Sequence, residues 1–260
     1  MRGAESARSA ELRMSTNAPT YLLAKHVFLC MHGSDVVFLD LKEDKYLSME
    51  AAKVRSVLPL PMPSGKADDL PSRGGGTQSL GSNGGQRSAQ ALLKRGLLTT
   101  DPTVGKGVEI ARVDEPDADL IGIAPPVQPK IRPIDVVRFV TATISAWKDM
   151  RFGSLQAIVS KVSGRRCEQS DDADQLDLGR AKSCVAIFER MRPYMFSARD
   201  KCLFESFVLA NFLAMYDLYP QWVFGVRTDP FAAHCWLQHR RVVFNDYAEH
   251  AGEFTPIMII

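Results

Sequence analysis

The chain has 260 residues, of which 45% are hydrophobic and 24% are charged, a composition typical of a globular protein with about two domains. Its 32 Lys and Arg residues nearly balance its 30 Asp and Glu residues, and a formal charge of +2 argues against nonspecific nucleic-acid binding as the main activity. No apolar run approaches the ~20 residues that span a bilayer, and no secretory signal is recognisable, so we expect a cytoplasmic protein without a transmembrane segment.

The five cysteines lie far apart in the sequence, and none belongs to a C-x-x-C pair. This spacing argues against a disulfide framework and against a zinc site, so we expect reduced thiols and no metal. The chain also lacks the G-x-x-x-x-G-K-[ST] pattern of a phosphate-binding loop. We therefore expect no cofactor.

Three stretches have the composition of irregular structure. Residues 1–20 show no hydrophobic period, and we expect them to be disordered. Residues 63–87 are rich in Gly and Ser and are expected to form a loop inside the first folded unit. Residues 106–130 hold clustered acidic residues followed by prolines, and this composition predicts a linker between two domains.

The first unit, residues 21–105, begins with strand-forming sequence. HVFLCMHGSDVVFLDLKEDKYLSM at 26–49 contains three short apolar runs separated by turn-forming residues, which predicts a three-stranded antiparallel meander. The segment 51–58 favours a helix, and a second helix is expected from Ser88 to Lys94, ending at Gly96. A three-stranded sheet leaves an edge that accepts a guest peptide strand, although the same strands also suit an ordinary α+β core.

This order of strands and helices resembles the precursor-peptide recognition domains of ribosomal peptide biosynthesis, with FLDLKEDKYLSM at 38–49 as the best-matching piece. The resemblance covers residues 21–100, and the Gly-rich insertion departs from it. It implies a winged-helix-like fold in which the leader of a precursor peptide pairs with the third strand and packs on the last helix. The leader contacts that it implies are Lys45, Tyr46, Leu47, Ser48, Met49, Ala91 and Leu92.

The second unit, residues 131–260, changes from helical to strand periodicity. PIDVVRFVTATISAWKDM at 133–150 has apolar residues at helical spacing, and further helices are expected at 155–162, 175–193 and from about residue 198 onward. WVFGV at 222–226, AHCWLQH at 233–239 and RVVFND at 241–246 then predict antiparallel strands. The whole chain is therefore expected to be an α+β protein.

Three side chains in this layout predict nucleophilic chemistry. Cys202 falls in the first turn of a predicted helix, where free N–H groups favour a thiolate. A turn near residue 240 folds the two last strands together and places His234 opposite Asp246. Cysteine, imidazole and carboxylate then act as nucleophile, base and orienting group. The neighbouring Cys235 points to the other sheet face and is expected in the core, whereas Trp236 is a candidate wall of the cleft.

The segments CLFESFVLANFL at 202–213 and WVFGVRTDPFAAHCWLQHRRVVFND at 222–246 resemble the C-terminal domain of lasso-peptide B proteins, which are transglutaminase-like leader peptidases. The resemblance covers residues 131–260 and implies a transglutaminase-like or papain-like cysteine protease fold. Cys235 replaces a common alanine, and Gln238 replaces a usual acidic residue. The resemblance implies that the chain binds a lasso precursor leader, cuts it from the core peptide, and passes the core to a separate ATP-dependent cyclase.

Two other functions fit the same residues. A transamidase would use the same triad, with an amine in place of water resolving the thioester. A leader-binding scaffold would present the precursor to another enzyme without catalysing the cut. The masses of the products separate the first alternative from a peptidase, and a Cys202→Ala variant separates the second.

Overall fold

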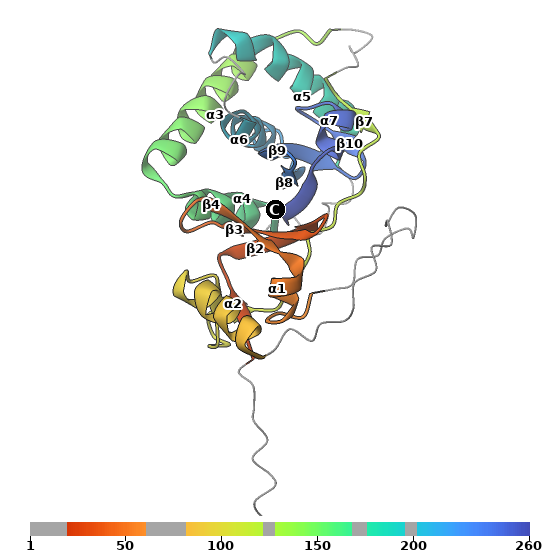
Figure 1. The fold of residues 1–260 in the computed structure, drawn as a ribbon. Helices are drawn as coiled ribbons and strands as arrows, with labels where there is room; N and C mark the ends of the chain where they lie inside the picture. The colour runs from red at the N-terminus through yellow and green to blue at the C-terminus, as the bar shows by residue number, and fades with distance from the viewer. Residues whose placement is uncertain (1–19, 61–81, 122–127, 168–175, 196–201) are drawn as a thin grey trace, which may run out of the picture.

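The computed structural model describes residues 20–60, 82–121, 128–167, 176–195 and 202–260 (Figure 1). The predicted disordered segment up to residue 19 and the part of the predicted Gly-rich loop up to residue 81 lie outside these ranges. The described residues form a mixed α+β structure with antiparallel sheets in both halves of the chain. The α+β fold class is thereby confirmed, while the winged-helix-like form of the first unit stays a prediction.

The first unit contains the predicted three-stranded meander. Its elements in chain order are β1 (Leu22–Ala24), β2 (Val27–His32), β3 (Asp35–Asp40), β4 (Lys45–Glu50), α1 (Ala51–Arg55), α2 (Ser82–Lys94), β5 (Leu98–Thr99) and β6 (Gly105–Lys106). Strands β2, β3 and β4 form one sheet in sequence order, and β1 pairs with β5 and β6 in a second small sheet. Within the described residues β4 pairs only with β3, so it is an edge strand.

Helix α2 is longer than the sequence predicts, because residues 82–87 are helical where a loop is expected. Glycine disfavours a helix, but packing against α1 and β5 outweighs that preference, with Ala89 and Leu92 buried in the core of the first unit. A Cβ atom on Gly85 would lie 3.3 Å from the Oγ atom of Ser56. Glycine therefore permits the close approach of this helix to the end of α1.

The β2–β3–β4 sheet is covered on both faces. Val27, Leu29, Val36 and Phe38 face the core that the sheet shares with α1 and α2. The alternate residues pack into the core of the second unit; they include Cys30, Val37, Leu39 and Leu41. Figure 1 accordingly shows this sheet between the two short helices and the C-terminal half. A strand that is buried on both sides needs apolar residues at nearly every position, as in VFLCM and VVFL.

The segment from 106 to 130 is not a free linker, and this prediction needs correction. Strand β6 pairs with β1, Ile110 bridges to Leu29, and β7 (Ala118–Asp119) pairs in parallel with β10 (Val242–Val243). The described part of this segment thus adds backbone pairing to both units. Its acidic and proline-rich composition reflects solvent exposure along an extended path, and that composition does not distinguish an edge strand from a tether.

In the described residues of the second unit, α-helices lie around and beside a five-stranded sheet. The helices are α3 (Pro133–Phe152), α4 (Leu155–Cys167), α5 (Leu178–Met191) and α6 (Cys202–Ala214), followed by the short α7 (Ala248–Gly252), and a 3-10 turn spans Arg192–Tyr194. The sheet has the order β11–β8–β9–β10–β7, with β8 (Gln221–Thr228), β9 (Phe231–His239) and β11 (Thr255–Ile259) as its long strands. Strand β11 is absent from the sequence prediction.

Helix α3 forms as predicted, but most of the apolar residues that predict it lie on its outer side. Val137, Ile144 and Trp147 are more than half exposed, at 58%, 52% and 55%. The buried side of the helix is formed by smaller and aromatic residues, including Phe139, Ala142 and Ala146. Two apolar stripes on one helix give the same period, so the period alone does not select the buried one.

Helix α6 is the central helix of the second unit. Positions 205–209 and 211–213 are all buried, which fits a sequence that is apolar on nearly every side. It packs against α3, α5 and β9, as Figure 1 shows. In the described part of the chain, no helix has both the length and the apolarity that crossing a bilayer requires.

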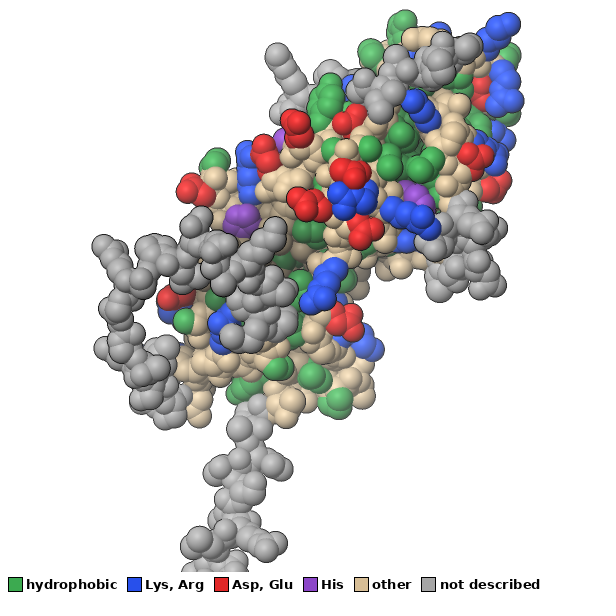
Figure 2. Space-filling model, turned by 90° about the vertical axis from the view of Figure 1, so that its right-hand side faces the viewer, with side chains coloured by type: hydrophobic (Ala, Val, Ile, Leu, Met, Phe, Trp, Pro, Cys, Tyr) green, Lys and Arg blue, Asp and Glu red, His purple; other side chains and the backbone are tan. Residues whose placement is uncertain are grey.

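Charges of both signs are interspersed over the face of the molecule that Figure 2 shows. Several of the exposed charges pair with each other, for example Arg241 with Asp117 at 2.5 Å and Arg227 with Glu253 at 2.5 Å. Among the described residues of this face, neither sign of charge dominates.

Candidate functional site

Cys202 is the first described residue of α6, so its sulfur lies at the N-terminal end of the buried central helix. The side chain is partly exposed, unlike those of Cys30, Cys184 and Cys235, which are buried. Helix α6 packs directly on β9, and this packing brings Cys202 to the strand that carries His234. Partial exposure beside a histidine distinguishes a reactive thiol from a structural one.

His234 and Asp246 meet although the second strand is shorter than predicted. Strand β10 ends at Val243, and its register pairs His239 with Val242, one residue away from the predicted alignment. The chain then leaves the sheet, and the Nε2 atom of His234 lies 2.6 Å from the Oδ2 atom of Asp246. Both side chains are mostly buried, with 15% and 13% exposed. The imidazole thus keeps its Nδ1 atom for Cys202.

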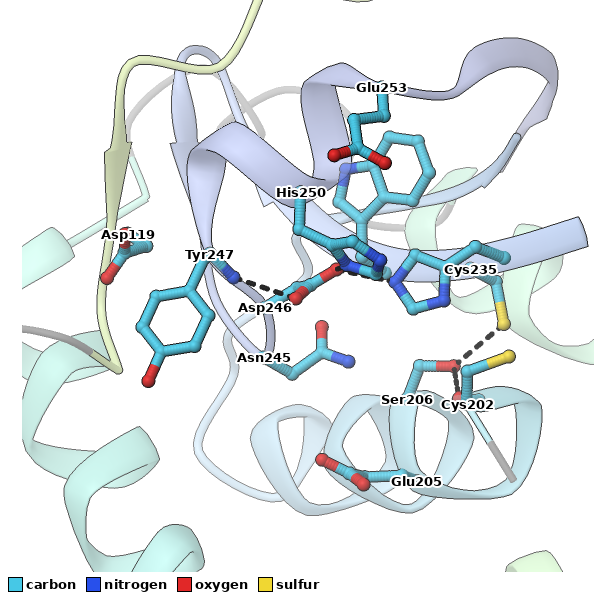
Figure 3. A network of polar contacts seen from close by, with 12 residues as sticks. Asp119, Cys202, Glu205, Ser206, Cys235, Asn245, Asp246, Tyr247, His250 and Glu253 are labelled. Atoms are coloured by element: carbon cyan, nitrogen blue, oxygen red, sulfur yellow. Dashed lines mark hydrogen bonds and ion pairs between the residues drawn. The ribbon is translucent and has the colours of Figure 1, made fainter. Parts of the chain in front are cut away.

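Asp246 contacts a second histidine. Its Oδ2 atom also lies 2.7 Å from the Nδ1 atom of His250 on α7, and its Oδ1 atom accepts a hydrogen bond from the Tyr247 N–H. Although burial alone raises the pKa of Asp246, these contacts with His234 and His250 outweigh it and lower that pKa. The carboxylate is therefore held ionised between two imidazoles, as Figure 3 shows for Asp246 and His250.

The thiol and the imidazole shift each other's pKa in opposite directions. A hydrogen bond from Cys235 opposes burial and, with a hydrogen bond and the positive charge of His234, lowers the pKa of Cys202 to about 4. Burial lowers the pKa of His234, but hydrogen bonds to Asp246 and Cys202 outweigh it and raise that pKa to about 9. Between these values the pair is a thiolate and an imidazolium, the form that attacks a carbonyl carbon.

A short polar network supports the start of α6. The Oγ–H of Ser206 donates to the carbonyl oxygen of Cys202 at 2.7 Å, and the Nε1–H of Trp222 donates to the Ser206 Oγ atom at 2.9 Å. The Ser206 Oγ atom also lies 3.4 Å from the sulfur of Cys235. The carboxylate of Glu205 is paired with Arg192 on the other side of the helix. These contacts hold the first turn of α6 in one orientation.

Several of these residues are missed by the sequence prediction. Ser206 follows Cys202 by four positions, and His250 follows Asp246 by four, so each pair lies on one side of a helical turn. This four-residue spacing is the feature of the sequence from which Ser206 and His250 could have been predicted. Trp222 and the proximity of Cys235 to Cys202 had no local signal, because both depend on how α6 packs on the sheet.

The sequence prediction places Trp236 and Leu92 where a substrate could reach them, but the structure buries both side chains. Trp236 is 1% exposed, its indole N–H donates to Gln238 at 2.7 Å, and its ring stacks on His234 with centroids 5.8 Å apart. It supports the imidazole from behind and does not wall an open cleft. Leu92 is fully buried in the first core, so its side chain is not available to a leader peptide, whereas Ala91 is exposed. The period of a sequence pattern shows which residues share one face of a helix or strand. It does not show which of the faces is covered by the rest of the protein.

Strand β4 presents its remaining predicted contacts along an edge of the first unit. Lys45 and Ser48 are exposed, and Tyr46, Leu47 and Met49 are partly buried. Residues Lys45, Tyr46 and Leu47 line a surface pocket of about 350 Å³ together with Phe38, Asp40, Glu43, Arg95 and Leu97. The alternation of β4 turns Tyr46 toward the second unit, where its ring meets that of Phe231 at 5.7 Å. Strand β4 therefore lies near the strand that carries His234.

One group of side chains in the described ranges has the composition of a metal-binding cluster. Ligand atoms of His234, Asp246 and His250 lie within 4.8 Å of one another. Asp246 already bonds both imidazoles, and His234 is shared with Cys202. The two imidazoles share one carboxylate oxygen, and this arrangement is more typical of a catalytic histidine oriented by an aspartate than of a metal-binding site.

Residues 146–259 match the family model described as Transglutaminase-like superfamily. Comparison with curated proteins gives no match, and comparison with solved structures gives none either. The matched segment runs from the end of α3 to the end of β11 and includes Cys202, His234 and Asp246. Domains of this superfamily are generally cysteine-protease-like, and the match therefore indicates cysteine protease or transamidase chemistry.

Proposed function

We propose that this transglutaminase-like domain is a cysteine peptidase that removes the leader of a ribosomal precursor peptide, as the lasso-peptide leader peptidases do. The observation that carries the proposal is the thiolate and imidazolium pair of Cys202 and His234, oriented by Asp246 at 2.6 Å. The triad lies within the segment that matches the superfamily. The N-terminal sheet packed against that domain supplies a place for the leader.

The proposed reaction is acyl transfer. The Cys202 sulfur attacks the scissile carbonyl carbon, and a tetrahedral oxyanion forms beside the backbone N–H groups of the first turn of α6. The His234 imidazolium gives its proton to the departing amine of the core peptide, the C–N bond breaks, and a thioester remains. His234 then takes a proton from water, which attacks the thioester and releases the leader carboxylate. Asp246 keeps the imidazole oriented through both steps.

The leader is proposed to add as a strand to the open edge of β4. Three predicted contact residues of β4 line the pocket next to this edge, and Tyr46 reaches Phe231, three residues before His234 on β9. A peptide that extends along β4 and past Tyr46 thus comes near Cys202 by a short and direct path. The freed core peptide would pass to an ATP-dependent lasso cyclase.

The experiment that tests the proposal compares three proteins on one substrate. The precursor peptide from a neighbouring reading frame is incubated with wild type, Cys202→Ala and Cys184→Ala, and the products are weighed by mass spectrometry. We expect wild type and Cys184→Ala to give separate leader and core masses that sum to the precursor plus one water, and Cys202→Ala to give none. Unchanged cleavage by Cys202→Ala would contradict the proposal and favour a leader-binding scaffold.

A transamidase is the second candidate, because the superfamily match covers this chemistry and both reactions share the thioester. The same mass measurement separates the two. With a primary amine added, a transamidase gives the leader with the amine attached, whereas a peptidase gives the leader with a free carboxylate.

A further inference from the structure

Two cysteines meet at the candidate active site, and only one of them has a place in the proposed reaction. Cys235 follows His234 on β9 and is 3% exposed, with its side chain on the face of the sheet that α6 covers. Cys202 lies on the first turn of that same helix. Figure 3 shows the two sulfur atoms on the same side of Ser206, next to each other.

The Ser206 hydroxyl already donates its hydrogen to one partner and accepts another from a second. The hydroxyl has one hydrogen, which goes to the carbonyl oxygen of Cys202 at 2.7 Å, and its oxygen accepts the indole N–H of Trp222 at 2.9 Å. Ser206 therefore has no hydrogen left for either sulfur. The hydrogen between the sulfur of Cys235 and its neighbours must come from Cys235 itself.

Two acceptors are available to the Cys235 thiol. One is the neutral oxygen of Ser206 at 3.4 Å, and the other is the sulfur of Cys202, which is charged in the reactive state. A charged acceptor forms the stronger hydrogen bond, so the Cys202 thiolate is the preferred partner. Burial without a cation of its own raises the pKa of Cys235 and keeps this thiol protonated, whereas Cys202 has His234 beside it.

We propose that Cys235 is a positioning residue that donates its S–H to the Cys202 thiolate and holds this sulfur in front of His234. The inference rests on the proposed function in one respect, since it takes Cys202 as the nucleophile. Ser206 and Trp222 fix the backbone of Cys202, and Cys235 fixes its sulfur. A buried cysteine that serves as a hydrogen-bond donor then supports the reactive cysteine in addition to the imidazole.

Other ionisable groups near Cys202 do not replace this donor. Glu205 on α6 is an acceptor held by Arg192, and its negative charge opposes a thiolate. Tyr46 from β4 and Cys202 act on each other only through charge. His234 from β9 supplies the cation, and Asp246 behind it strengthens that charge. Within the described residues, the neutral groups that donate to the Cys202 sulfur are the S–H and the backbone N–H of Cys235, and a substitution at position 235 removes only the S–H.

The test measures how fast iodoacetamide alkylates Cys202 in the full chain between pH 3.5 and 9, with a phosphine reductant present. In this reaction the thiolate sulfur displaces iodide, so that an S–C bond forms and a C–I bond breaks. Peptide mass spectrometry reports Cys202 alone. Loss of one hydrogen bond to a charged acceptor is expected to raise the alkylation midpoint by about one pH unit in Cys235→Ala. The rate below both midpoints then falls about tenfold.

Three further variants complete the design. Cys235→Ser keeps a donor of similar size and is expected to restore a midpoint close to that of wild type. Cys184→Ala removes another thiol that is also 3% exposed, on α5, and is expected to leave the midpoint unchanged. Cys235→Val fills the same space without a donor, so it replaces Cys235→Ala in the comparison if the alanine variant fails to fold in a thermal melt.

Equal midpoints for Cys235→Val, Cys235→Ala and wild type would overturn the inference, as would a wild-type midpoint near that of an ordinary cysteine. Failure of the proposed function has a different signature. In that case Cys202→Ala still cleaves the precursor, while the alkylation midpoint of Cys202 continues to differ between Cys235→Ser and Cys235→Val.

Discussion

Asp246 is the residue on which the candidate triad depends, because one of its carboxylate oxygens contacts two imidazoles. His234 lies at 2.6 Å and His250 at 2.7 Å. The ring of His234 is also enclosed by Trp236, Phe254 and His250, with centroids 5.0 to 5.8 Å away. A ring enclosed in this way loses little orientation when it exchanges a proton. The contact of Asp246 with His250 adds a member that a three-residue triad lacks.

The pH dependence of cleavage follows from the two shifted pKa values. The active form has an ionised Cys202 and a protonated His234, so it appears as the pH rises through the thiol pKa of about 4 and disappears above the imidazole pKa of about 9. We expect a bell-shaped plot of kcat/KM against pH with limbs near these values. Rates at substrate concentrations well below KM would check it, and a single limb near pH 8.5 would contradict an ion pair.

Substitutions of Asp246 and of its second partner, His250, should differ in their effect on the rate. Asp246→Asn removes the charge that orients His234, and we expect kcat/KM to fall by about 10³ to 10⁴. His250→Gln keeps a donor toward Asp246 and should lower it by less than about tenfold, because His250 is half exposed and does not touch Cys202. Steady-state rates at neutral pH compare them, and an equal loss in both variants would show that His250 takes part directly.

At the level of elements, β4 and β9 connect the predicted recognition site to the candidate catalytic site. Strand β4 has an open edge, and Tyr46 on it packs on Phe231 of β9. Strand β9 in turn carries His234 near its middle. The two strands belong to different sheets, yet a ring contact joins them. Under the proposed function, a leader peptide that pairs with β4 would lie close to β9.

Charge on the edge of β4 should weaken leader binding and leave the fold intact. Lys45 and Ser48 are both exposed, so Lys45→Glu and Ser48→Glu remove no core contact. We expect each to raise the Kd for a fluorescent leader peptide by about three- to tenfold, through repulsion and altered strand pairing. Lys148→Glu on α3 is the matched control for Lys45→Glu, since both substitutions replace one exposed positive charge by a negative one. Equal Kd values for all variants would exclude β4 as the docking edge.

On the scale of the whole molecule, the two units share one core. The side of β2 and β3 that carries Cys30, Val37 and Leu39 packs in the same cluster as α6 and β8. Strand β11 lies against β2, and the Nδ1 atom of His32 contacts the Thr255 hydroxyl at 2.8 Å. The interface between the units is thus built like a domain interior. We expect the two units to unfold together and not one after the other.

This shared core predicts that two leucine substitutions in different parts of the chain shift one and the same unfolding transition. Leu39→Ala should lower the free energy of unfolding by about 2 to 5 kcal/mol and shift the single transition of the whole chain, because Leu39 is fully buried in the shared cluster. Leu92→Ala removes an equally buried leucine from the core of the first unit alone, and because the units unfold together it is expected to shift the same single transition in both signals. Urea unfolding followed by circular dichroism and by Trp fluorescence measures both.

The three Trp residues all lie in the second unit, at 147, 222 and 236, so fluorescence reports on that unit. Coincident transitions in both signals for Leu39→Ala support one cooperative core. If fluorescence stays at its wild-type midpoint while circular dichroism shifts, the units are energetically separate and the shared core has no thermodynamic role.

The amino-acid pattern was sufficient for the properties that depend on neighbours in the chain. Short apolar runs separated by turn-forming residues at 26–49 predicted β2 to β4, and helical spacing predicted α3, α5 and α6. The turn near residue 240 brought His234 and Asp246 to the same place in the prediction, one residue out of register. These features follow from local geometry, since strand and helix periods are fixed by the backbone.

The remaining features required the three-dimensional fold, because contacts between distant segments leave no period in the sequence. They include β11, the pairing of residues 105–119 with both units, the exposed apolar side of α3, and the burial of Leu92 and Trp236. The neighbourhood of Cys202 belongs to the same group. Alternation correctly turned Cys235 away from the His234 side, but only the packing of α6 on that other face put a second sulfur next to the first.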